Sequence, residues 1–269
     1  MALSRTYAIF LRQVYLFRST PTRLAGVFLW MIIDIIQWGF ISKYLGTMGN
    51  ATFGFLTCIL GAIILWGFMA RIQQGIMTSF LEDIWSQNFI NYFASPLKII
   101  EYLSGLVLTS ITTAVTGIVT VVCIAGIAFG YNFFMIGLAL VPFIIVLFIF
   151  GMAMGIFVSG MIFRLGPTAE WLGWPIPLVL SLFAGVYYPV STLPPALQAV
   201  SRLIPASYVF ESLRDVLLRQ ATFADVALFL LIGAALAILY LCAAYAFFIK
   251  IYRHNLESGA IARFSAESL

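Results

Sequence analysis

The sequence predicts an all-α integral membrane protein with six transmembrane helices, and two observations carry that prediction. First, 63% of the 269 residues are hydrophobic, only 9% are charged, and the mean hydropathy is +1.07. Soluble domains carry about 25% charged residues, so this chain has too little polar surface to cover a globule in water. Second, its apolar runs are continuous, whereas the strands of a transmembrane β-barrel alternate apolar and polar residues.

A transmembrane helix needs about 20 mostly apolar residues to cross a hydrocarbon layer of about 30 Å. Six such runs are bounded by polar residues, proline or glycine: 24–45, 53–72, 102–129, 133–163, 171–188 and 223–251. An even number of spans places both termini on one side, and basic residues mark the cytoplasmic side. With both termini cytoplasmic, only four of the 14 basic residues lie outside (Lys43, Arg202, Arg214 and Arg219). We therefore expect this orientation, in the plasma membrane of a bacterium (the inner membrane).

Residues 1–22 are predicted to form an interfacial helix ahead of a single six-span domain at residues 23–269. The segment is largely apolar, but Arg5 and Arg12 are seven residues apart and therefore share one face. A helix of this kind lies along the membrane surface. Pro21 separates it from the first span.

The first span contains a polar pair. Asp34 lies near its middle, and Gln37 follows three residues later on the same helix face. A carboxylate at mid-membrane costs at least about 2.5 kcal/mol, so it requires a compensating contact. Two interpretations remain open, an interhelical hydrogen bond or a contact along a translocation path. An ion-coupled secondary carrier would use Asp34 in the second way, although one isolated acid and no internal repeat argue against it.

Residues 82–93, between the second and third spans, are predicted to form a short amphipathic helix on the cytoplasmic side. The turn signal Ser95-Pro96 follows it. Such a helix either connects two spans or docks a partner protein, and its acidic start and aromatic body favour docking. The side chains expected to make this contact are Glu82, Asp83, Trp85, Phe89, Tyr92, Ser95 and Pro96.

Residues 189–222, between the fifth and sixth spans, contain two short helical segments punctuated by prolines. They are too short to cross the membrane, so they are predicted to be re-entrant helices on the outer side. Glu211 and Arg214 are three residues apart and are expected to pair as a clamp on an outer gate. With Asp215 they also fit a membrane enzyme, which would need clustered polar side chains at one face.

Small residues recur at four-residue spacing in two spans. Gly151 and Gly155 form a GxxxG motif in the fourth span, and Gly233 and Ala237 form a similar pair in the sixth. Such pairs let helices approach closely. We predict that they pack helices within one chain and do not join subunits.

The composition also excludes several chemistries. No Gly-Lys dipeptide occurs, so the chain lacks a phosphate-binding P-loop. His254 is the single histidine, so neither a His-based metal site nor a Ser-His-Asp triad can form. We expect no catalytic residue, metal or cofactor on this chain. The basic residues are scattered, so we expect no binding of nucleic acid.

One stretch is more specific than the rest. Residues 183–189 read Phe-Ala-Gly-Val-Tyr-Tyr-Pro, and Leu193-Pro194, Leu197, Pro205, Tyr208, Glu211, Leu213 and Arg214 follow. This pattern resembles the signature of the membrane-spanning subunit of type-2 ATP-binding cassette exporters, and the similarity covers nearly the whole chain. The outer gate would then consist of Tyr187, Tyr188, Pro189, Pro205, Glu211 and Arg214.

The resemblance implies that residues 82–93 are a coupling helix that receives motion from a separate ATPase. The chain departs from the family's common opening, Glu-Arg-Glu-x-Gly-Thr, because it reads Glu82-Asp83-Ile84-Trp85-Ser86. The resemblance implies a complex of two permeases and two ATPase subunits. ATP and Mg²⁺ would bind to the ATPases, and the permeases would contact membrane lipid. The implied function is export of a hydrophobic or amphipathic substrate, such as a drug-like molecule, a lipid or a lipid-linked glycan.

Overall fold

The computed structural model describes all residues except 1, 20, 48–52, 87–90, 93–94 and 259–269, and each regular element in this part is a helix. The all-α prediction is therefore confirmed for the described residues. In chain order the elements are α1 (Ala2–Ser19), α2 (Pro21–Thr47), α3 (Phe53–Trp85), α5 (Ile99–Phe129), η1 (Phe133–Ala139), α6 (Leu140–Leu165), η2 (Pro167–Gly173), α7 (Pro175–Phe183), η3 (Val190–Thr192), α8 (Pro195–Ser201), α9 (Pro205–Leu218) and α10 (Phe223–Glu257). The η elements are 3-10 helices.

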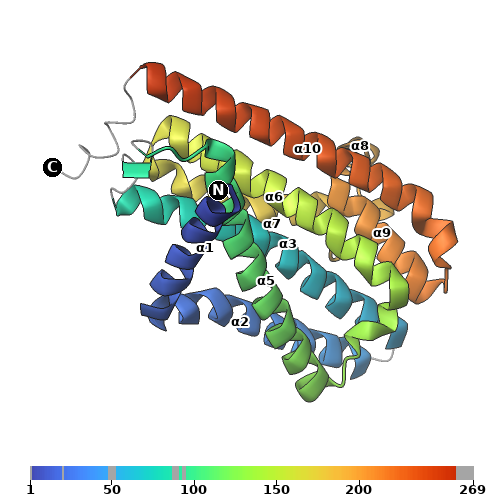
Figure 1. Cartoon of the computed structure of the whole chain (residues 1–269). Helices are drawn as coiled ribbons and strands as arrows, with labels where there is room; N and C mark the ends of the chain where they lie inside the picture. The colour runs from blue at the N-terminus through green and yellow to red at the C-terminus, as the bar shows by residue number, and fades with distance from the viewer. Residues whose placement is uncertain (1, 20, 48–52, 87–90, 93–94, 259–269) are drawn as a thin grey trace.

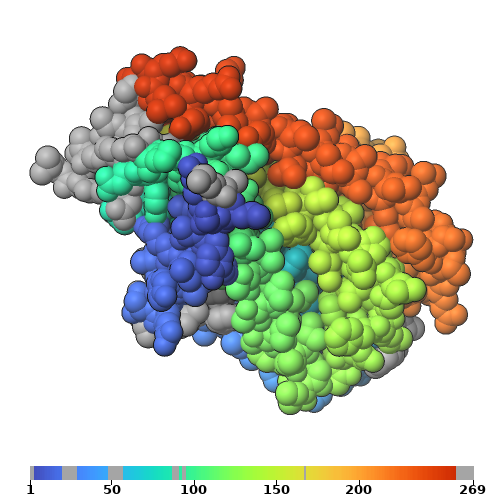
Figure 2. Space-filling model, in the orientation of Figure 1, coloured from blue at the N-terminus to red at the C-terminus, as the bar shows by residue number. Residues whose placement is uncertain are grey.

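The long helices form a bundle with α3 at its centre (Figure 1). In α3, 78% of the most apolar window is buried, compared with 22% in α5 and in α10. Helices α5 and α6 both pack on α3, and α10 packs along α6. Figure 2 shows α5 and α6 covering most of α3 on one face of the molecule.

The bundle has two distinct ends. We call one the α1 end, because it holds α1, the last turns of α3, α6 and α10, and the first turn of α5. The rings of Phe80, Phe163 and Phe248 meet there, with centroids 5.8 to 5.9 Å apart. The opposite end, the α9 end, holds α8, α9 and the first turn of α10 (Figure 1). The first and last described helices thus reach the same end of the bundle.

Four helical stretches in the described part are long and apolar enough to cross a membrane, judged by length and composition. They are Thr57–Trp85, Ile99–Phe129, Phe133–Leu165 and Phe223–Glu257. Helix α2 is 27 residues long, which corresponds to about 40 Å. It carries Asp34, Gln37 and Lys43 and is not among the four stretches.

Helix α3 differs most from its predicted range. The predicted span ended at residue 72 and a separate helix began at Glu82, but α3 continues without a break from Phe53 to Trp85. The separate start at Glu82 was therefore wrong. The reason is a stripe of side chains that stays buried beyond residue 72, made of Ile72, Ile76, Phe80 and Ile84. Polar residues on the opposite face lowered the average hydropathy and concealed this stripe.

The predicted fifth span, residues 171–188, is not one continuous helix. It is divided between η2 and α7, and α7 has nine residues, which correspond to about 14 Å. Pro175 and Pro177 lack the backbone N–H that would continue the hydrogen bonds of η2 into α7. Beyond α7, Gly185 has a φ of 73°, a conformation that favours glycine. The prediction of a single helix here was wrong.

The GxxxG motif packs helices within the chain, as predicted. A Cβ atom added to Gly151 would lie 2.8 Å from the backbone oxygen of Met69, and one added to Gly155 would lie 2.9 Å from Cβ of Ile76. Helices α3 and α6 therefore approach closely only because both positions lack a side chain. Gly233 similarly packs α10 against Pro205 and Tyr208 of α9.

Replacement of Gly151 with alanine is expected to lower the stability of the purified protein by about 1–3 kcal/mol, because the new methyl group meets fixed backbone. The matched control is Gly67→Ala, since nothing lies within 4 Å of a Cβ added there. That change gains helix propensity worth up to about 1 kcal/mol. Thermal unfolding in detergent, followed by size-exclusion chromatography, measures both. Equal melting temperatures would contradict the close approach of α3 and α6.

Candidate functional site

A groove runs along α3 between α2 and the segment formed by η2 and α7. It consists of two adjoining pockets with volumes of about 340 and 560 Å³, which share Trp30, Arg71, Gln74 and Trp174. The smaller pocket extends toward the α1 end, where Glu82 and Trp85 line it. The larger pocket extends in the other direction and includes Asp34, Gln37, Trp66, Ser181 and Tyr187.

Regular spacing on two helices produces this lining. On α3, Arg71, Gln74, Thr78 and Glu82 follow at intervals of three, four and four residues, so they share one face. On α2, Trp30, Asp34 and Gln37 share a face in the same way. The structure thus brings the two predicted path residues, Asp34 and Gln37, into one groove with a polar stripe of α3. That stripe was not singled out from the sequence.

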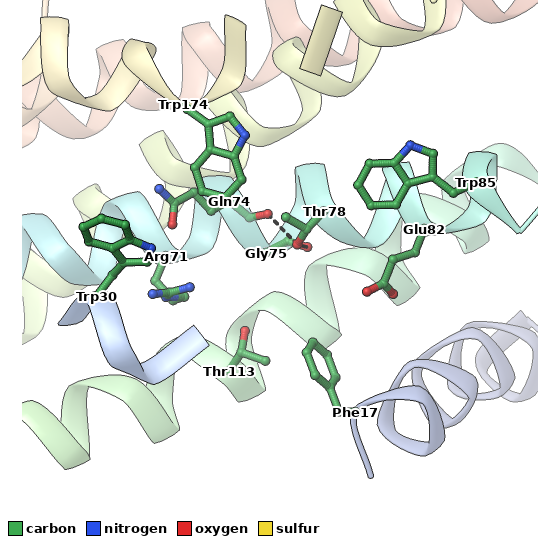
Figure 3. Close-up of a pocket in the computed structure, with 10 residues that line it drawn as sticks. All are labelled: Phe17, Trp30, Arg71, Gln74, Gly75, Thr78, Glu82, Trp85, Thr113 and Trp174. Carbon is green, nitrogen blue, oxygen red and sulfur yellow. Dashed lines mark hydrogen bonds between the residues drawn. The ribbon is translucent and has the colours of Figure 1, made fainter. Parts of the chain in front are cut away.

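Figure 3 shows the smaller pocket from inside. The guanidinium group of Arg71 lies beside Trp30, and the Trp174 ring lies next to Gln74. The Thr78 hydroxyl donates to the backbone oxygen of Gln74 at 2.8 Å, so this hydroxyl is already engaged as a donor. Aromatic surface and a few polar groups therefore face the same space.

Two aromatic rings stack at the part of the groove nearer the α9 end. Trp38 of α2 stacks on Tyr187, with centroids 4.9 Å apart and planes 14° from parallel. Tyr187 also lines the larger pocket. The adjacent Tyr188 turns away from this stack, and its hydroxyl donates to the Leu182 backbone oxygen at 2.6 Å. Of the two tyrosines assigned to an outer gate, Tyr187 is the one in contact with α2.

The loop after α7 is held to α9 by hydrogen bonds between the loop backbone and an ion pair of α9. Arg214 donates to Glu211 at 2.8 Å, and its other nitrogen donates to the backbone oxygens of Gly185 and Val186. Glu211 in turn accepts a hydrogen bond from the Val190 backbone N–H at 3.0 Å. The predicted pairing of these two residues is confirmed.

The remaining outer residues complete this arrangement. Pro189 precedes η3, and its backbone oxygen accepts from the Thr192 hydroxyl at 2.7 Å. Pro205 is buried and is the first residue of α9. Backbone N–H groups in the first turn of a helix have no intrahelical acceptor, so a proline there removes no hydrogen bond. Asp215 pairs with Arg219 at 2.9 Å. Both ion pairs of α9 and its C-terminal end, Glu211–Arg214 and Asp215–Arg219, therefore make structural contacts.

A buried carboxylate organises the α1 end. Asp83 of α3 is fully buried, pairs with Arg12 of α1, and accepts a hydrogen bond from the Tyr102 hydroxyl of α5 at 2.7 Å. Three helices therefore meet at one acidic side chain. Burial lowers the pKa of Arg12, but the charge of Asp83 and the hydrogen bond to it, with smaller effects of Tyr92 and Tyr102, outweigh burial, so the pKa is raised. We conclude that Asp83 holds the fold together and has no surface with which to touch a partner, which corrects its predicted docking role.

The other predicted docking residues differ in their exposure. Tyr92 lies under the Arg12 guanidinium, whose central carbon is 5.4 Å from the centroid of the Tyr92 ring. The phenol pKa of Tyr92 is raised, mainly by burial and secondly by the negative charge of the nearby Asp83. Trp85, Ser95 and Pro96 are exposed at the α1 end. Glu82 is half-buried at the mouth of the groove. Phe89 lies outside the described residues.

Helix α1 also differs from its expected environment. Arg5 and Arg12 share one face as predicted, but this face packs on protein, since Arg5 reaches Glu101 at 3.4 Å. Ile9, on the same face, fills the space over Gly105 of α5. The exposed side of α1 is largely apolar and includes Leu3, Tyr7, Val14 and Tyr15. Arg5 and Arg12 thus anchor α1 to the bundle.

The long apolar helices and the groove along α3 together define a helical membrane protein with a groove between its helices. A family model for ABC-2 type transporters matches residues 5–218, from α1 to the end of α9. The chain therefore belongs to the ABC-2 type transporter family. It is a permease subunit, and membership implies that it works with an ABC ATPase subunit. Among curated proteins, a search found no match to this chain.

Proposed function

We propose that this permease exports a hydrophobic or amphipathic substrate through the groove on α3, using ATP hydrolysed on a separate subunit. One observation carries the proposal: the groove is continuous from the Trp38–Tyr187 stack to Glu82 and Trp85 at the α1 end. A path of this kind leads from the α1 end toward the α9 end, which is the direction in which an exported substrate must move. Its apolar and aromatic lining with a few polar groups suits a drug-like molecule, a lipid or a lipid-linked glycan.

The proposed topology has six crossings and two cytoplasmic termini. Helices α2, α3, α5, α6 and α10 supply five crossings, and η2 with α7 and the loop after it supplies the sixth. Helices α8 and α9 then form a re-entrant element on the outer side. Arg71 lies in the middle of α3 in this topology and is not counted on either side. Nine basic residues then lie on the inner side and four on the outer side, so the excess of basic residues remains cytoplasmic. A bacterial inner membrane fits this orientation.

Two permeases and two ATPases make up the proposed complex. The groove is open along one side, and a second copy facing it would close the path. The exposed residues Trp85, Ser95 and Pro96 at the α1 end form the proposed docking surface. ATP and Mg²⁺ bind the partner in this proposal.

Affinity purification of the tagged permease from native membranes tests the proposal. We expect an ABC ATPase subunit to co-purify in equal amount, and Trp85→Ala to reduce its recovery at least about fivefold, because exposed tryptophans are frequent interface anchors. Phe134→Ala is the matched control, since Phe134 is an exposed aromatic residue at the α9 end. Recovery of the permease without any ATPase would favour an ion-coupled carrier that uses Asp34.

A further inference from the structure

Arg71 occupies an unusual place for a cation. It is the fifteenth residue of the 29-residue apolar stretch Thr57–Trp85, and its side chain enters the groove beside Trp30 (Figure 3). A cation at mid-span costs about 2.5–3.5 kcal/mol on insertion scales. A charge retained at such a position therefore needs a compensating partner or a function.

The described part of the chain supplies no such partner. The Nε atom of Arg71 is buried without a hydrogen-bond partner, and the side chain forms no ion pair with a described residue. Two acids line the same groove. Glu82 lies eleven residues further along α3, at a distance of about 16 Å, and Asp34 lies on α2; neither pairs with Arg71. The guanidinium thus presents unused donors to the groove.

The surroundings of Arg71 show what those donors fit. Gln74 lies one turn away on the same face, and its side-chain amide supplies a further neutral donor. Trp30 and Trp174 provide apolar walls on either side of this polar point (Figure 3). A guanidinium fork binds carboxylate and phosphate oxygens in pairs. Asp34 shares the larger pocket and repels a second negative charge.

We propose that the groove selects amphiphiles with a single anionic group, which Arg71 and Gln74 bind while the apolar part lies against Trp30 and Trp174. This proposal rests on the proposed function, in which the groove is the substrate path. It narrows the substrate class from amphipathic molecules in general to singly charged acidic ones.

Photolabelling of the full-length permease in phosphatidylcholine nanodiscs tests the proposal. The probes are a diazirine derivative of hexadecanoic acid and its methyl ester, which share one tail and differ in charge. We expect the acid to label peptides of α2, α3 and α7 at least about tenfold more efficiently than the ester, because hydrogen bonds to charged groups are strong. Arg71→Gln should remove this preference and leave ester labelling unchanged, whereas Arg71→Lys should keep part of it.

The control is Arg202→Gln, because Arg202 is an exposed arginine at the α9 end; the preference should survive there. Equal labelling of the native groove by acid and ester would overturn the anionic preference and leave the proposed path intact. Equal loss of both labels in Arg71→Gln would make Arg71 a structural residue and overturn the proposal. Competition by inorganic phosphate alone at millimolar concentration would identify a free-anion site instead. Absence of groove labelling by either probe would overturn the path as well.

Discussion

Replacement of Asp83 with alanine is expected to destabilise the permease on the order of 3–5 kcal/mol, which is the usual cost of removing one partner from a buried ion pair. The change would leave Arg12 without its carboxylate and the buried Tyr102 hydroxyl without its acceptor. Helix α1 would then lose its main polar attachment to α3. A melting temperature in detergent and the yield of monodisperse protein measure the effect.

The control for Asp83→Ala is Asp215→Ala. Asp215 also pairs with an arginine, but the Arg219 side chain is 79% exposed, and surface pairs contribute about 0–1 kcal/mol. The double variant Arg12→Leu with Asp83→Leu should recover much of the stability lost in either single variant, because no buried charge is left alone. Equal melting temperatures for Asp83→Ala and Asp215→Ala would show that the buried pair does not hold the α1 end together.

Replacement of Arg214 with glutamine is expected to release the loop after α7. Arg214 is 12% exposed and connects Glu211 with the backbone oxygens of Gly185 and Val186. Without the guanidinium, Glu211 and the two backbone oxygens lose the hydrogen bonds that Arg214 donates. The hydrogen bond from the Val190 N–H to Glu211 would then remain without the support of Arg214. We expect hydrogen exchange in residues 185–190 to accelerate at least about tenfold, because charged hydrogen bonds contribute about 1.5–3 kcal/mol each.

Mass-spectrometric hydrogen exchange of the permease in nanodiscs measures this release, and transport-linked ATPase activity should fall with it if the loop is the outer gate. Arg214→Lys keeps a charge for Glu211 but cannot reach both backbone oxygens at once, so an intermediate rate is expected. Arg219→Gln, at the residue that follows the last turn of α9, is the matched control. Unchanged hydrogen exchange in Arg214→Gln would show that Arg214 does not hold the loop after α7.

Much of the helical frame was predictable because membrane helices depend on continuous apolar runs. The predicted ranges for the third, fourth and sixth spans lie within a few residues of α5, of η1 with α6, and of α10. The break at Pro21 and the Glu211–Arg214 pair also follow from short-range rules, since proline fixes the backbone and residues three apart share a helix face.

The rest depended on contacts between residues distant in the chain. Arg12 and Asp83 are 71 positions apart, and only the packing of α1 on α3 and α5 brings them together. Arg71 was counted among the cytoplasmic flanking residues because an average over a window does not separate the two faces of a helix. The spacing of Arg71, Gln74, Thr78 and Glu82 was the available signal, and it indicates one polar face on a long helix.

The unbroken course of α3 has a mechanical consequence. Arg71 and Trp85 lie on one helix with no proline between them, about 21 Å apart along its axis. An α-helix of this length behaves as a stiff rod, so it turns or shifts as a whole. A displacement of its last turn therefore also displaces the Arg71 guanidinium group, because both belong to one rigid helix. Sharp kinks in helices arise mainly at proline, at pairs of glycine and serine, and at π-bulges. A proline introduced at Met77 would therefore let the two halves of α3 move separately, so that less of the displacement at Trp85 would reach Arg71.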